Sequence, residues 1–160
     1  MTTRGADLVS RLLQIAAGVI LGVISAALLI TIHRATVELG GVPVPTGLLL
    51  GAVFQLAASL FLLNAFASRL PVLILVVTWG AVATILSLEG PGGGVLVPAQ
   101  IGDRMQYAGW IVQGIGVGIP LLVLLVDWTG RMRRITAERE AAATGDREMS
   151  APRDTAPERR

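Results

Sequence analysis

Few side chains in this 160-residue chain could take part in chemistry. His33 is the only histidine, so a metal site or a Ser/His/Asp triad would depend on this single imidazole. We expect His33 to lie at the interfacial end of the first apolar segment, where water can reach it. The absence of cysteine excludes thiolate nucleophiles and cysteine-ligated metals, and all thirteen basic residues are arginine, which excludes lysine chemistry. The acidic residues that could still act as a general acid or base lie at the edges of apolar segments: Glu38, Glu89, Asp103 and Asp127. We therefore predict no catalytic residue, no cofactor and no metal, and expect that the chain is not an enzyme.

Two side-chain amides, Gln55 and Gln113, lie inside long apolar segments. An amide in hydrocarbon must find hydrogen-bond partners, so we expect both to face other helices. They would bond each other, or Thr78 and Thr84. We interpret these amides first as side chains that hydrogen-bond neighbouring helices to each other, and ligand binding is the alternative.

A glycine-rich run, Gly114-Ile115-Gly116-Val117-Gly118-Ile119-Pro120, interrupts the last apolar segment. Pro120 has no N–H to donate to the carbonyl of Gly116, and its ring disfavours a straight helix. The run predicts a bend or a locally opened helix, with Gly114, Gly118 and Pro120 as its key residues. Broken helices line substrate sites in secondary transporters. The alternative is a kinked helix that packs closely on its neighbours.

The elements that position these residues follow from composition. The chain is 53% hydrophobic and 15% charged, with a mean hydropathy of +0.70, whereas soluble domains are about 25% charged. A membrane span needs about 20 apolar residues. We predict an all-α, polytopic membrane protein with four transmembrane helices arranged as two hairpins. The expected spans are about 12–32, 46–67, 70–88 and 106–128; the first is too long for a secretory signal peptide. Before the second span, Gly40, Gly41, Pro43 and Pro45 predict a break in regular structure until about Thr46.

Small residues recur every four positions on the first two expected spans. Gly18 and Gly22 form such a stripe on the first, and Gly51 precedes Gln55 on the second. Stripes of this kind allow two helix backbones to approach closely. We interpret them as packing within the chain, with a homodimer face as the alternative.

The arginines predict the orientation, because short cytoplasmic flanks carry an excess of positive charge. With both termini inside, six flanking arginines are cytoplasmic and two, Arg34 and Arg104, are outside. Residues 1–11 then form a cytoplasmic N-terminus. Residues 129–160 form a charged cytoplasmic tail, which we expect to be largely disordered except for a helix over 131–143. The net charge of +2 is too small to indicate a nucleic-acid partner.

The chain carries the motif Gly40-Gly41-Val42-Pro43-Val44-Pro45-Thr46-Gly47-Leu48-Leu49-Leu50, together with Val97-Pro98 and an arginine-rich tail. In these features it resembles a family of small four-helix actinobacterial membrane proteins of unknown function. The similarity covers about residues 12–128. It implies a four-span inner-membrane protein with no assigned activity, cofactor or site residue. Genes of this family often lie beside mycothiol-biosynthesis genes.

These observations favour a non-enzymatic structural or accessory protein of the bacterial cytoplasmic membrane. Its partners would be the lipid bilayer and either another membrane protein or further copies of the chain. The alternative is a small oligomeric transporter or channel that uses the broken fourth helix.

Overall fold

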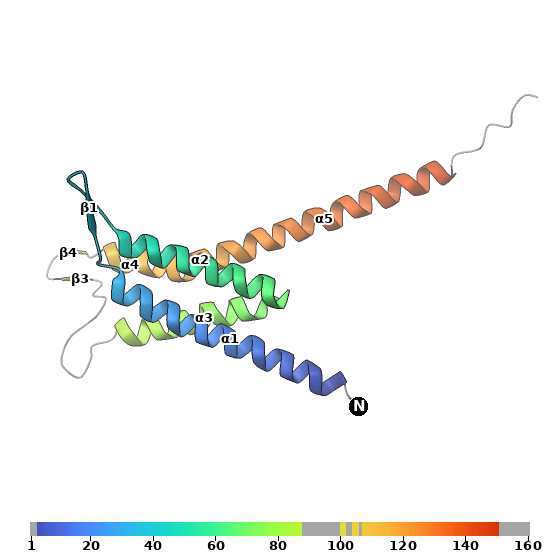
Figure 1. Ribbon diagram of the computed structural model, residues 1–160. Coiled ribbons are helices and arrows are strands. Elements are labelled where there is room, and N and C mark those ends of the chain that lie inside the picture. Colours follow the sequence, from blue (N-terminus) through green and yellow to red (C-terminus); the bar gives the residue numbers. More distant parts are fainter. Residues whose placement is uncertain (1–2, 88–99, 102–103, 106, 151–160) are drawn as a thin grey trace, which may run out of the picture. The chain divides into compact units, whose positions relative to one another are not determined.

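The computed structural model describes residues 3–87, 100–101, 104–105 and 107–150, and in these it is all-α apart from two short strand pairs (Figure 1). The helices are α1 (Thr3–Ile32), α2 (Thr46–Phe66), α3 (Leu70–Ser87), α4 (Tyr107–Gln113) and α5 (Ile119–Ser150). A π-helical segment, η1 (Gly114–Gly118), joins α4 to α5. Within the described residues, four helical stretches are long and apolar enough to cross a membrane: Asp7–Ile32, Thr46–Phe66, Leu70–Ser87 and Gly109–Ala143. The predicted fold class is confirmed.

The helix boundaries show where hydropathy is a good guide. Helices α2 and α3 begin at residues 46 and 70, as expected, and end at 66 and 87. Helix α1 begins at Thr3, so it contains the expected span of 12–32 and extends beyond it toward the N-terminus. Charged residues such as Asp7 and Arg11 mark the limit of the apolar segment, but they do not break a helix. At 1.5 Å per residue the 30 residues of α1 extend about 45 Å, which exceeds a hydrocarbon core of about 30 Å.

A β-hairpin links α1 to α2, although the glycines and prolines of this segment were expected to prevent regular structure. Strands β1 (Val37–Leu39) and β2 (Val42–Val44) are antiparallel, with Leu39 opposite Val42. Gly40 and Gly41 form the two-residue turn with φ of 60° and 82°, the left-handed values that such hairpin turns require. A second pair, β3 (Gln100–Ile101) and β4 (Arg104–Met105), precedes α4.

The chain divides into two compact units, residues 1–124 and 125–160. In the first unit, α1 packs most extensively along α3 and less along α2, and η1 contacts α1, α2 and α3 (Figure 1). Two apolar clusters fill these contacts. One contains Ala26, Leu29, Ile30, Trp79, Ala83 and Val112, and the other contains Ala58, Leu62, Val72 and Leu75. The arrangement as two hairpins stays a prediction.

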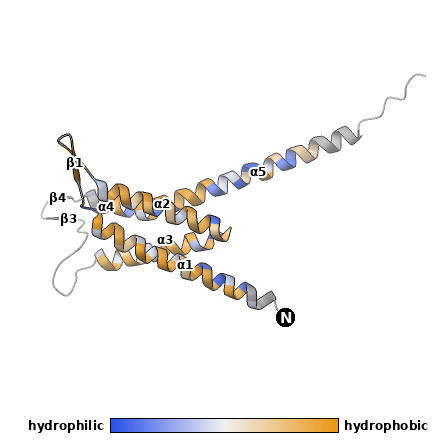
Figure 2. Cartoon of the chain, in the orientation of Figure 1, coloured by the Kyte–Doolittle hydropathy of each residue, from blue (hydrophilic) through white to orange (hydrophobic). Residues whose placement is uncertain are grey.

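The second unit corrects our expectation for the tail. Helix α5 continues to Ser150, so residues 129–150 are helical rather than largely disordered; residues 151–160 lie outside the described part. Hydropathy falls sharply along α5 (Figure 2). The segment lacks the apolar residues for a core, which favoured disorder, but its alanines, arginines and glutamates have high intrinsic helix propensity. Local propensity explains the longer helix.

Candidate functional site

The most distinctive polar contact joins Gln55 on α2 to the backbone of η1. The side chain of Gln55 is fully buried, and its Nε2 donates a hydrogen bond of 2.7 Å to the carbonyl oxygen of Gly116. In an α-helix that carbonyl would accept from the N–H four residues later, but residue 120 is proline and has none. Gln55 therefore supplies a donor to the carbonyl that Pro120 cannot serve.

Trp79 on α3 contacts Gly116 from another helix. Its side chain is fully buried, and a methyl group added to Gly116 would overlap the indole ring at Cε2, Cζ2 and Cη2. By contrast, a methyl group added to Gly114 or Gly118 would meet no atom within 4 Å among the described residues. Gly116 is thus the glycine of the run at which close packing requires the absence of a side chain. We call Gln55, Trp79 and Gly116 the polar centre.

Two atoms of the polar centre are buried without a hydrogen-bond partner among the residues that the structure describes: Gln55 Oε1 and Trp79 Nε1. One is an acceptor and the other a donor. Buried polar groups are normally hydrogen-bonded, because leaving one unpaired in an apolar environment is energetically costly. The polar centre therefore has hydrogen-bonding capacity beyond its single bond to Gly116.

The structure corrects the partners that the sequence suggested for the two amides. Gln55 bonds the Gly116 carbonyl and not Gln113, which is half-buried. Thr84 donates to the carbonyl of Gly80 in its own helix, at 2.7 Å. The predicted pairing of Gln55 with Gln113, Thr78 or Thr84 is wrong. The signal for the real partner was Pro120, whose missing N–H points to the carbonyl at position 116.

The small-residue stripes lie at contacts within the chain. A Cβ on Gly18 would lie 2.5 Å from the carbonyl oxygen of Pro71, and one on Gly22 would lie 2.8 Å from Cβ of Thr78, both on α3. On α2, an added Cβ at Gly51 would overlap Leu29 of α1. These glycines let α1 approach α3 and α2 closely.

The residues considered for catalysis or metal binding are not assembled into a site. His33 is 8% exposed, and its Nδ1–H donates to the carbonyl of Ile30 at 2.6 Å, so it is a buried structural side chain rather than the solvated interfacial group we expected. Glu38 lies on the exposed strand β1, while Glu89 and Asp103 fall outside the described residues. Within the described part of the chain, no three His, Cys, Asp or Glu residues group as metal ligands.

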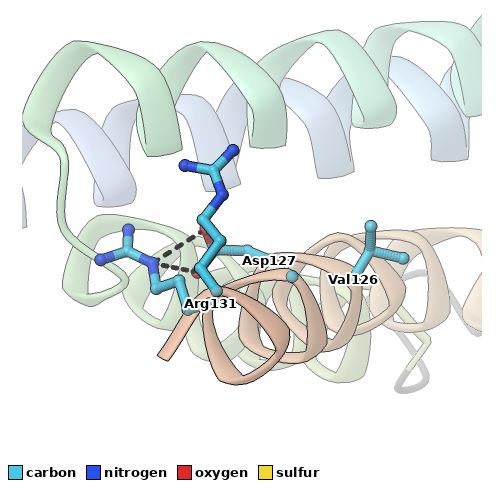
Figure 3. A pocket seen from close by; sticks show the side chains of 5 residues that line it. Val126, Asp127 and Arg131 are labelled. Atoms are coloured by element: carbon cyan, nitrogen blue, oxygen red, sulfur yellow. Dashed lines mark hydrogen bonds and ion pairs between the residues drawn. The ribbon is translucent and has the colours of Figure 1, made fainter. Parts of the chain in front are cut away.

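A surface hollow on α5 contains the remaining acidic candidate, Asp127. Its lining consists of Val126, Asp127, Gly130, Arg131 and Arg134 (Figure 3). Arg131 Nε donates to both carboxylate oxygens of Asp127, each at 3.1 Å, one helical turn apart. The side chain of Arg131 is about half exposed. This geometry fits an ion pair between successive turns of one helix better than an acid–base residue.

No protein-family model, curated protein or solved structure matches this chain. Its class is therefore defined by the fold alone. It is an all-α protein, and in its described residues four apolar helical stretches are each long enough to cross a membrane.

Proposed function

We propose that this chain is a non-enzymatic, structural or accessory protein of the bacterial cytoplasmic membrane that acts through membrane partners. One observation carries the proposal. In the most apolar window of each candidate span, only 28% to 33% of the residues are buried inside the protein. Most of the apolar surface is thus available to lipid and to other membrane helices.

The exposed aromatic residues support a membrane location. Tyr107 and Trp110 are 73% and 64% exposed near the start of the fourth stretch, and Trp128 is 50% exposed toward its charged end. Amphipathic rings favour the two membrane–water interfaces. The arginine distribution favours an orientation with both termini in the cytoplasm.

The charged part of α5 supports a role through partners. Residues 129–150 carry five arginines and four acidic residues on a helix, and the side chains described there, through residue 143, are exposed. A helix with both signs of charge and no core of its own is suited to docking on a complementary protein surface.

Affinity purification tests this proposal. The full chain, a version lacking 129–160 and a matched control lacking only 151–160 would be expressed at equal levels and gently solubilised. We expect the same partner with the full chain and the control, and its loss without 129–160. Recovery of the chain alone in all three samples would contradict a partner-dependent role.

The second candidate function is a small oligomeric transporter or channel. The observation that favours it is η1, a π-helical segment of the fourth stretch beside buried polar atoms of Gln55 and Trp79. Its test is solute flux into proteoliposomes. Loss of flux in Gln55→Leu or Gln113→Leu would support it, and flux that survives both substitutions would remove these amides from the pathway.

A further inference from the structure

We infer that the polar centre binds one water molecule, which accepts a hydrogen bond from Trp79 Nε1–H and donates one to Gln55 Oε1. This inference does not depend on the proposed function, because it concerns how three helical segments satisfy their buried polar groups.

The two unpartnered atoms belong to side chains that meet at one residue. Nε2 of Gln55 is 2.7 Å from the carbonyl oxygen of Gly116. Oε1 and Nε2 of Gln55 are bonded to one side-chain carbon, Cδ, so Oε1 lies close to this contact. The indole atoms that a Cβ on Gly116 would overlap include Cε2, which is covalently bonded to Nε1. Gly116 therefore brings an acceptor from α2 and a donor from α3 into the same neighbourhood.

The orientation of the Gln55 amide is fixed by chemistry. Exchanging its oxygen and nitrogen would place Oε1 against the carbonyl oxygen of Gly116, where two acceptors would repel each other. The oxygen is therefore the atom left unpaired, and it can only accept. The indole nitrogen of Trp79 can only donate.

These two requirements select the ligand. It must accept one hydrogen bond and donate another, and it must be small, because the indole ring already fills the space beside Gly116. A cation is repelled by the indole N–H, and an anion is repelled by the amide oxygen. Water meets every requirement, and buried waters typically bridge otherwise unpaired polar groups in this way.

The test is magnetic resonance of the full chain in lipid bilayers, with nitrogen-15 in the tryptophan indoles. The Trp110→Phe, Trp128→Phe double variant leaves Trp79 as its one indole signal, and both replaced side chains are at least half exposed. We expect a cross-peak between the Trp79 indole proton and water. We also expect that the cross-peak is lost when Gln55→Met, an apolar replacement of similar shape, is added.

The matched control is Asn64→Leu, which removes an exposed amide from the same helix and should leave the cross-peak intact. Absence of a water cross-peak in the double variant would overturn the inference, whether or not Gln55→Met folds. An indole resonance that shifts with Gln55→Met but never shows a water contact would also overturn it, because that result identifies a direct bond from Trp79 to Gln55. A cross-peak that persists in folded Gln55→Met would remove Gln55 as the water's acceptor.

Discussion

Gln55 donates a hydrogen bond from its side chain to the backbone carbonyl of Gly116, 61 positions further along the chain, at 2.7 Å. The acceptor is the carbonyl that Pro120 leaves without its usual α-helical donor. One amide therefore ties α2 to the interrupted fourth stretch at the point where that stretch departs from α-helical geometry. The irregular segment can be retained in an apolar environment because a neighbouring helix satisfies its backbone.

Replacing Gln55 with methionine should remove this bond without a large change of shape. We expect the free energy of unfolding to fall by about 0.5–2 kcal/mol, the range for hydrogen bonds between membrane helices. Reversible unfolding in mixed micelles would measure it. Asn64→Leu is the control, because Asn64 is exposed and bonds a carbonyl of its own helix. Equal effects of the two substitutions would show that the bond to Gly116 contributes nothing specific.

Gly116→Ala should destabilise the protein more than alanine at either neighbouring glycine of the run. The new methyl group would overlap the buried ring of Trp79, and overpacking of this kind costs about 1–3 kcal/mol. The methyl groups of Gly114→Ala and Gly118→Ala would meet no described atom within 4 Å, so these variants should change the free energy of unfolding little. The same unfolding assay compares them. Three indistinguishable variants would mean that Trp79 does not pack against Gly116.

The close packing of α1 against α3 can be tested by comparing the stabilities of two further glycine-to-alanine variants. Gly22→Ala would place a methyl group 2.8 Å from Cβ of Thr78 and 3.1 Å from the carbonyl oxygen of Leu75, so the two helices must separate. Within the part of the chain that the structure describes, Gly80→Ala on α3 meets nothing within 4 Å. We expect a lower thermal midpoint for Gly22→Ala than for Gly80→Ala. The reverse order would argue that the glycine stripe of α1 faces lipid or another copy of the chain.

The ion pair between Arg131 and Asp127 should contribute little to stability. Exposed pairs one helical turn apart typically contribute about 0.3–0.5 kcal/mol; here the Arg131 side chain is 51% exposed and that of Asp127 is 17% exposed. Arg131→Gln should therefore change the free energy of unfolding by less than about 1 kcal/mol. A loss of several kcal/mol would show that the hollow on α5 contributes to the fold.

The sequence predicted the parts of this fold that hydropathy controls. Uncharged runs bounded by proline, glycine or arginine predicted both ends of α2 and of α3 to within one residue. It was less informative where local backbone preference decides. Gly40 and Gly41 were treated as breakers, although a glycine pair between short apolar runs is also a signal for a hairpin. The extension of α5 likewise follows from intrinsic helix propensity rather than burial.

The polar centre was predicted only in part, and the reason is physical. Gln55 and Pro120 were recognised separately, because each is unusual within an apolar helix. Their connection requires knowing that α2 and η1 are neighbours, which is tertiary information. The contact of Trp79 with Gly116 depends in the same way on the packing of α3 against η1. Residue types identified the unusual positions, but the arrangement of helices determined which of them meet.

We propose that the chain crosses the membrane four times with both ends in the cytoplasm, and cysteine labelling tests this directly. Because the chain has no cysteine, single cysteines can be placed at exposed positions: Asp7→Cys on α1, Glu38→Cys on β1, Ala67→Cys after α2 and Thr136→Cys on α5. An impermeant maleimide would be applied to intact cells, or to spheroplasts where an outer barrier exists, and then to lysed cells. We expect labelling of Glu38→Cys alone before lysis and of all four variants after it. Labelling of Asp7→Cys, Ala67→Cys or Thr136→Cys from outside, or protection of Glu38→Cys, would contradict it.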